Sequence, residues 1–261
     1  MTPEDAAAPG LGPWTVHPVP DEGDVPVSVG PLTLRIAQES GEIRLALVRD
    51  TTAADGEAPG WIRWAPADWT GQVALIPVFP DRPVVVVPED SFWLLAGAEA
   101  RIYVRVPLWV RVEALGRTPT ALLSVPTVES SDTWWGTVEE GELCYWLGTR
   151  ARRRVTEDLL ADHLAVCPLQ LVNRSPDDLH VDKIAFRVAY LSLFAHEGRG
   201  IWADVTRVRY LGEAEGSRLE MSGEPPAEAP GAKLLAPPRE RMARGFRART
   251  FARLRSIQGW I

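Results

Sequence analysis

The 261-residue sequence holds only two cysteines, Cys144 and Cys167, and they are not in C-x-x-C spacing. Two cysteines are too few for a disulfide framework, which is typical of a protein from a reducing compartment. Long apolar runs are also missing, since the segments VALIPVF and FWLLAGA are each followed within two residues by an acidic residue. A membrane-spanning helix needs roughly 20 predominantly apolar residues, so we expect no transmembrane helix.

The N-terminus also lacks the features of a secretory signal. Its first residues, MTPEDAAAPGLGPW, are acidic where a signal peptide carries positive charge, and no uninterrupted apolar stretch follows them. We therefore expect a cytoplasmic protein.

Motifs for catalysis or nucleotide binding are missing too. The sequence has no G-x-S-x-G, no G-x-x-x-x-G-K-[ST] and no G-x-G-x-x-G after a strand, and its four histidines are scattered. His163 and Cys167 have the spacing of two zinc ligands on a helix, with Cys144 as a conceivable third, but no second pair supports them. The sequence predicts no catalytic residue, no metal site and no cofactor, although an enzyme is not excluded.

What the sequence does contain is alternation of apolar and polar residues. In RIYVRVPLWVRVE, residues 101–113, Ile102 and every second residue after it are apolar, which predicts a β-strand with one buried face. Pro107 cannot donate to a ladder, so it indicates an edge, a bulge or a break into two strands. LTLRIAQESGEIRLALV predicts a hairpin that turns at residues 39–41.

Similar short runs recur along both halves of the chain, separated by turn residues. They predict a mainly β fold, an antiparallel β-sandwich formed as one large unit or as two related lobes. Two helices are expected besides, one near residues 156–166 with Thr156 as its N-cap, and one in the C-terminal tail.

The domain organisation follows from composition. We expect a flexible N-terminal segment over residues 1–28 and a sandwich body over 29–222, with a possible subdivision near 125. Residues 223–238 are rich in Pro and Ala and predict a linker, and residues 239–261 predict a basic amphipathic helix.

Charge is unevenly distributed. Residues 233–261 carry a net charge of +7, whereas the other 232 residues carry −14. The basic tail fits an anionic membrane surface or an acidic protein partner, or else it packs on the acidic body. Its candidate contact residues are Arg241, Arg244, Arg247, Arg249, Arg253, Arg255 and Trp260.

Residues 131–154, SDTWWGTVEEGELCYWLGTRARRR, combine tryptophans, carboxylates and arginines. The favoured interpretation is a polar turn between two strands with its aromatics packed on the body, because Trp134 and Trp135 are adjacent and must point to opposite faces. Arg150 and its basic neighbours are interpreted as a solvated strand end, or as a site for a phosphate or an acidic partner. The candidate ligand or partner surface comprises Asp132, Trp134, Trp135, Glu139, Glu140, Glu142, Trp146, Arg150 and Arg152.

Three segments in order, ARIYVRVPLWVRVEAL, SDTWWGTVEEGELCYWLGTRA and CPLQLVNRSPDDLHVDKIAFRVAYLSLF, resemble the prokaryotic family named domain of unknown function 432. The resemblance covers most of residues 30–220. It implies no catalytic residue, because the family has no assigned activity. Family members encoded near small mechanosensitive channels imply a role at or near the inner membrane.

Two functions of different classes remain. The first is a non-catalytic β-sandwich interaction or regulatory module, membrane-proximal through its basic tail, with a protein or an anionic membrane as partner. The second is a sugar-binding or carbohydrate-active protein that uses its tryptophans and the Glu139–Glu142 region. Nucleic acid is disfavoured as a partner, because the acidic body repels phosphate. The sequence does not give the oligomeric state.

Overall fold

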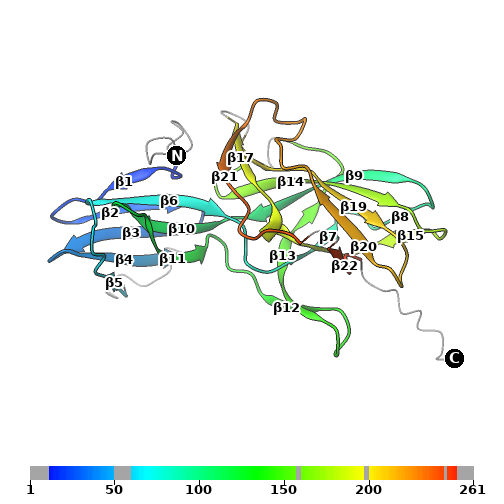
Figure 1. Ribbon diagram of the computed structural model, residues 1–261, viewed down its shortest axis with the longest axis horizontal. Coiled ribbons are helices and arrows are strands. Elements are labelled where there is room, and N and C mark those ends of the chain that lie inside the picture. Colours follow the sequence, from blue (N-terminus) through cyan, green and yellow to red (C-terminus); the bar gives the residue numbers. More distant parts are fainter. Residues whose placement is uncertain (1–11, 50–59, 157–159, 197–199, 244–245, 252–261) are drawn as a thin grey trace.

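The computed structural model describes residues 12–49, 60–156, 160–196, 200–243 and 246–251. Along these residues the chain forms twenty-two β-strands and a short 3-10 helix, η3 (Val188–Tyr190). The predicted mainly β fold class is therefore confirmed. The strands build two lobes that lie end to end in an elongated molecule (Figure 1). Within the described part of the chain, no helix is long and apolar enough to cross a membrane.

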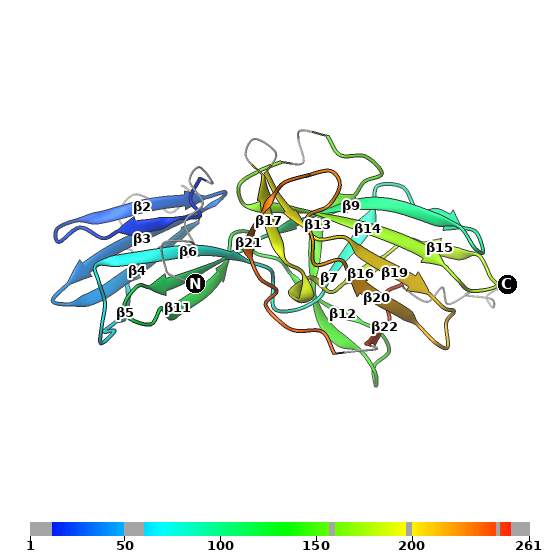
Figure 2. The same ribbon diagram turned by 45° about the horizontal axis from the view of Figure 1, so that its top comes forward.

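The first lobe consists of two four-stranded sheets that pack face to face (Figures 1 and 2). One sheet has the order β1 (Val16–Pro18), β6 (Gln72–Val78), β10 (Trp109–Ala114) and β11 (Thr120–Pro126). The other has the order β2 (Asp24–Val29), β3 (Leu32–Glu39), β4 (Glu42–Arg49) and β5 (Ile62–Trp64). Alternate apolar residues of both sheets, such as Leu34 and Val110, are buried in one core.

The second lobe is built around an eight-stranded sheet. Its order is β21 (Lys233–Ala236), β17 (Leu193–His196), β18 (Gly200–Ala203), β14 (Leu164–Asn173), β19 (Thr206–Tyr210), β20 (Ser217–Met221) and β22 (Arg247–Ala248), with β9 (Glu99–Pro107) also paired to β14. A second sheet contains β12 (Asp132–Trp135), β13 (Glu142–Ala151), β7 (Val84–Pro88) and β16 (Ile184–Phe186). β8 (Phe92–Leu94) and β15 (Leu179–Val181) form a separate two-stranded ribbon. Most pairs are antiparallel, but β14 runs parallel to β18 and β19, and β13 runs parallel to β7.

The chain passes between the lobes after β6, after β9 and after β11, so the lobes are interleaved in sequence (Figure 1). β7, β8 and β9 belong to the second lobe, and β10 and β11 return to the first. A proline lies at each passage, namely Pro80, Pro107 and Pro126.

Hydrogen bonds across the lobe interface join the two bodies. The Trp14 indole N–H donates to the carbonyl of Asp162 at 2.7 Å, and the Leu108 amide donates to the carbonyl of His163 at 2.9 Å. The His163 ring packs against Gly30, where an added Cβ would lie only 2.4 Å from the imidazole. Burial lowers the pKa of His163, an effect that the neighbouring Asp162 carboxylate partly opposes.

The predicted strand over residues 101–113 exists and is broken at its proline, one of the three expected outcomes. β9 ends at Pro107 and β10 starts at Trp109. The apolar side chains from Ile102 to Val112 are buried in both strands, so the predicted buried face is confirmed.

Neither predicted helix is supported. Residues 157–159 lie outside the described residues, and from Leu164 onward the chain is β14. This segment, LAVCPLQLVN, is buried almost throughout, and three strands pair with it. Residues 164–166, the end of the predicted helix, therefore form a strand, because pairing with distant strands outweighs the local helical pattern.

The C-terminal helix prediction fails for a similar reason. Arg247–Ala248 forms β22 on the edge of the large sheet, while residues 252–261 lie outside the described residues. The predicted linker, residues 223–238, contains β21, which pairs with β17. Its Glu228 carboxylate accepts hydrogen bonds from Arg101 and Tyr103 of β9.

Candidate functional site

The tryptophan-rich segment forms a hairpin from β12 and β13 that projects from the second lobe (Figures 1 and 2). Trp134 pairs directly with Leu143 across the hairpin. The Trp134 indole lies over Gly141, where a Cβ would come within 2.1 Å of Nε1, and it donates to the carbonyl of Thr137 at 2.8 Å. Only glycine at position 141 leaves room for this ring, so the indole is fixed in place.

The two adjacent tryptophans have different environments. Trp134 is 54% exposed, whereas Trp135 is 8% exposed. Trp135 donates from Nε1 to the carbonyl of Arg249 at 2.7 Å, which fastens the turn end of the hairpin to residues 246–251, here named the C-terminal segment. The pair therefore forms no common stacking platform, as expected for neighbours in an extended chain.

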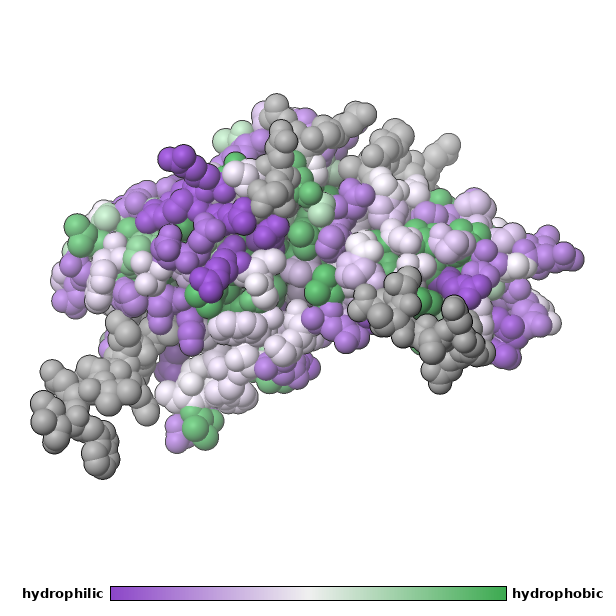
Figure 3. Space-filling model, turned by 180° about the vertical axis from the view of Figure 1, so that it is seen from behind, coloured by the Kyte–Doolittle hydropathy of each residue, from purple (hydrophilic) through white to green (hydrophobic). Residues whose placement is uncertain are grey.

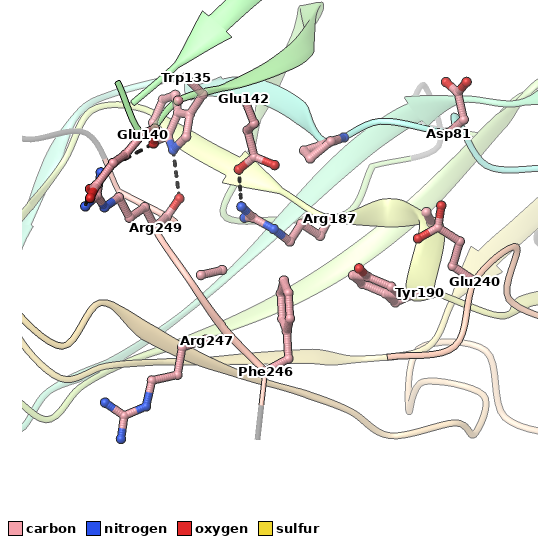
Figure 4. Close-up of a pocket in the computed structure, with 14 residues that line it drawn as sticks. Asp81, Trp135, Glu140, Glu142, Arg187, Tyr190, Glu240, Phe246, Arg247 and Arg249 are labelled. Atoms are coloured by element: carbon pink, nitrogen blue, oxygen red, sulfur yellow. Dashed lines mark hydrogen bonds and ion pairs between the residues drawn. The ribbon is translucent and has the colours of Figure 1, made fainter. Parts of the chain in front are cut away.

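A cavity of about 610 Å³ lies between the hairpin and the C-terminal segment (Figure 4). Its wall includes Trp135, Glu140 and Glu142 from the hairpin, Arg187 and Tyr190 from the η3 region, and Phe246 and Arg249 from the C-terminal segment. Segments that are distant in sequence thus converge on one cavity.

Two carboxylate–guanidinium pairs bridge this cavity. Glu142 pairs with Arg187, and Glu140 pairs with Arg249 (Figure 4). The Arg187 side chain is only 9% exposed, its guanidinium lies 5.7 Å from the Phe246 ring, and its Nη1 has no hydrogen-bond partner within the described residues. Phe246 also packs edge-on against Tyr190, with ring centroids 5.6 Å apart.

Three titratable groups in or near the cavity, Cys144, Glu140 and Glu142, are buried or paired with arginine. Cys144 belongs to β13 of the hairpin, where burial, and then the charge of Glu142, raise the pKa of its thiol to about 11. A thiol with that pKa stays protonated at neutral pH and is a poor nucleophile. Glu140 and Glu142, the two carboxylates nearest to it in sequence, are both committed to ion pairs with arginine.

The other residues of the predicted surface are dispersed. Asp132 forms an ion pair with Arg82 at 3.3 Å. The Lys183 ammonium makes a cation–π contact with Trp146, 5.9 Å from the centre of its ring. Glu139 is exposed on the hairpin turn. Arg150 and Arg152 lie away from the cavity at Glu89, the former bonded to its carbonyl and the latter 3.8 Å from its carboxylate.

The predicted tail contacts are only partly described. Arg247 pairs with Glu215 at 3.2 Å, and Arg249 pairs with Glu140, so both pack on the acidic body. Arg241 is exposed. Arg244, Arg253, Arg255 and Trp260 lie outside the described residues.

The sequence reasoning missed Arg187, Tyr190 and Phe246 as residues of a site. In the sequence Arg187 is one arginine among many, and only its burial against Phe246 distinguishes it from a surface arginine. No pattern in the sequence carries that signal.

The family model described as "Protein of unknown function (DUF432)" matches residues 13–255. The chain belongs to the DUF432 family. No curated protein and no solved structure matches it. The DUF432 match spans both lobes, the hairpin and the C-terminal segment, so the cavity lies wholly inside the region that the family shares, and the family resemblance seen in the sequence is confirmed.

Proposed function

We propose that this DUF432 protein is a non-catalytic interaction module that binds a protein partner through the outer face of its β12–β13 hairpin. A single observation carries the proposal: the hairpin exposes Trp134 (54%), Val138 (88%) and Leu143 (40%). The space-filling view from behind shows that the hairpin projects from the second lobe (Figure 3). Large apolar side chains that gather on a projecting element are typical of a protein-binding surface.

The hairpin is also suited to binding because it is held in one conformation before a partner arrives. Trp135 and the Glu140–Arg249 pair fix its turn end, and Gly141 leaves room for the Trp134 ring. A surface ordered in advance loses less conformational entropy on binding, and tryptophan is enriched among residues that dominate binding energy.

The charge around this face defines the partner. Glu139 and Asp132, both exposed, flank the apolar residues. The partner should therefore offer an apolar depression with a basic rim. An anionic bilayer would repel the same carboxylates, so the hairpin is better suited to a protein.

Membrane attachment through the basic tail has less support. Arg247 and Arg249 would have to leave Glu215 and Glu140 before they could reach a lipid surface. The sugar-binding alternative at this hairpin is also weakened, because Trp135 is buried and Glu140 and Glu142 are paired.

Site-specific photo-crosslinking tests the proposal. A photoreactive amino acid at position 138 of the full chain, expressed in cells of its source, should give a defined protein adduct, and Trp134→Ala should reduce that adduct at least tenfold. The same probe at Leu234, which is 61% exposed on β21, is the matched control and should give no such adduct. An adduct that persists undiminished in Trp134→Ala, or no adduct at position 138, would refute the proposal.

A further inference from the structure

A second cavity, of about 510 Å³, lies at the end of β13, where residues 150–154 include four arginines. Its volume falls within the range of about 300–1,000 Å³ that is typical of small-molecule pockets. Charged side chains and an aromatic ring form much of its wall, which includes Glu89, Asp90, Phe92, Arg152, Arg153 and Arg154. None of these residues lines the cavity beside the hairpin, so any role here is separate from the proposed docking function.

Backbone hydrogen bonds on both sides hold the arginine-rich end of β13 in place. The Arg152 amide donates to the carbonyl of Tyr103 at 2.9 Å, and the Tyr103 amide donates to the carbonyl of Arg152 at 2.7 Å. On the other side, the Glu89 amide donates to the carbonyl of Ala151 at 2.8 Å. The side chains of the next residues therefore start from a backbone that is fixed in the second lobe.

Arg153 is positioned over an aromatic ring at the cavity. Its guanidinium carbon lies 4.1 Å from the centre of the Phe92 ring, and the residue remains exposed. Stacking occupies one face of the guanidinium and leaves the N–H groups at its edge available to a ligand. Arg154 is exposed as well, and neither arginine pairs with a carboxylate among the residues that the structure describes. Two accessible guanidinium groups thus lie at one cavity wall.

The charges of the wall favour an anion. The carboxylate of Glu89 lies 3.8 Å from Nε of Arg152, so these two charges offset each other. Among the described lining residues, Asp90 then opposes only one of the two charges of Arg153 and Arg154. A net positive wall in a chain with an overall charge of −7 attracts an anion to this place, while most of the surface repels it.

We propose that this cavity binds a phosphate group, carried by a small phosphate ester or by a lipid headgroup, with Arg153 and Arg154 as its donors. A phosphate carries close to two negative charges at neutral pH, and a guanidinium fork meets two of its oxygens at once. The apolar part of the wall lowers the local dielectric and so strengthens this pairing. Of the interpretations that the sequence left open, a recess of this size suits a compact anion better than the surface of an acidic protein.

Calorimetric titration of the full chain tests the site, with inorganic phosphate, glycerol 3-phosphate and glucose 6-phosphate as separate probes. At least one probe should bind saturably, and the double change Arg153→Ala with Arg154→Ala should weaken its binding at least tenfold. Arg153→Lys keeps the charge but loses the planar fork, so it should weaken binding at least threefold. Asp90→Asn removes the opposing charge and should tighten binding.

Co-sedimentation with phosphatidylcholine vesicles that contain phosphatidate distinguishes the two sources of the phosphate. Binding to these vesicles alone, lost in the double variant, would assign the phosphate to a lipid headgroup. Binding of a soluble probe alone would assign it to a small molecule.

Arg117→Ala is the matched control, because Arg117 is an exposed arginine of the first lobe that pairs with no carboxylate within the described part of the chain. It should leave binding unchanged, with circular dichroism showing that every variant is folded. The double variant should also keep the crosslink at position 138, so this test is independent of the docking hairpin. Absence of binding to every soluble probe and to the vesicles would overturn the inference. Binding that survives the loss of both arginines, or that Arg117→Ala weakens equally, would overturn it as well.

Discussion

At the scale of single residues, Arg187 is the side chain that links the charged and the aromatic parts of the main cavity wall. It is nearly enclosed, pairs with Glu142 and lies against Phe246. Arg187 is the buried member of the pair, so removal of Glu142 would leave its charge without a carboxylate partner. Arg187 lies between the end of β16 at Phe186 and the start of η3 at Val188.

The two thiols should be inert in the native protein. Cys144 and Cys167 are both fully buried, and burial raises the pKa of each, to about 11 for Cys144. At pH 8 a thiol with a pKa near 11 is about 0.1% thiolate. We expect iodoacetamide at pH 8 to label neither cysteine in native buffer and both in 8 M urea, as read by mass spectrometry. Rapid native labelling of Cys144 would contradict the burial argument.

At the scale of secondary-structure elements, structure formed by neighbouring residues was predictable from the sequence, whereas the pairing of strands that are distant in sequence was not. The β3–β4 hairpin was predictable from alternation and from its turn, where Ser40 and Gly41 both have positive φ. The parallel pairs of β14 could not be predicted, because nothing in the sequence names the strands that will flank it. The same gap explains why residues 223–238 were predicted as a linker.

Glu228 anchors residues 223–238 to β9. This contact leads to a prediction about the pH dependence of stability. Arg101 donates to its carboxylate twice at 2.9 Å, and the Tyr103 hydroxyl donates at 2.5 Å. Burial alone would raise the pKa of Glu228, but the hydrogen bonds from Tyr103 and Arg101 hold it below the ordinary value of 4.5. A depressed acid pKa stabilises the fold above the unfolded-state pKa, and this stability is lost as pH falls through the folded-state pKa.

Glu228→Gln should therefore lower the free energy of unfolding by about 1–2 kcal/mol at pH 7, a value reduced for partial exposure. The difference from the native chain should be smaller at pH 3 than at pH 7, because the stability that comes from a depressed pKa is lost progressively as pH falls below the unfolded-state pKa. Urea denaturation at both pH values measures it. Glu224→Gln is the control, because Glu224 is exposed in the same segment and should change stability at neither pH. A deficit of equal size at pH 3 and pH 7 would show that the carboxylate charge is irrelevant.

At the scale of the whole molecule, the two lobes behave as one interleaved body. The sequence predicted one large sandwich or two related lobes, because short alternating runs recur along both halves of the chain. Composition could not reveal that β7, β8 and β9 leave the first lobe and that β10 and β11 return to it. This exchange depends on contacts at the lobe interface, so the interface should contribute to the stability of both lobes.

Gly30 tests that interface. It has a φ of +58° and meets the His163 ring, so Gly30→Ala adds both backbone strain and a clash. Gly41, with a φ of +79° and no atom near an added Cβ, is a matched control that suffers the strain alone. Left-handed backbone costs a non-glycine residue about 1–2 kcal/mol, and overpacking adds about 1–3 kcal/mol.

Gly30→Ala should therefore lower the free energy of unfolding by about 2–5 kcal/mol, and Gly41→Ala by about 1–2 kcal/mol. Gly30→Ala alone should also raise the pKa of His163 toward its ordinary 6.5, because a displaced ring regains solvent. Hydrogen exchange of the Leu108 amide, which donates to His163 across the interface, should quicken in that variant alone. Equal effects of the two substitutions on all three measurements would mean that the interface contributes nothing beyond turn strain, and the lobes would then have to be stable independently of each other.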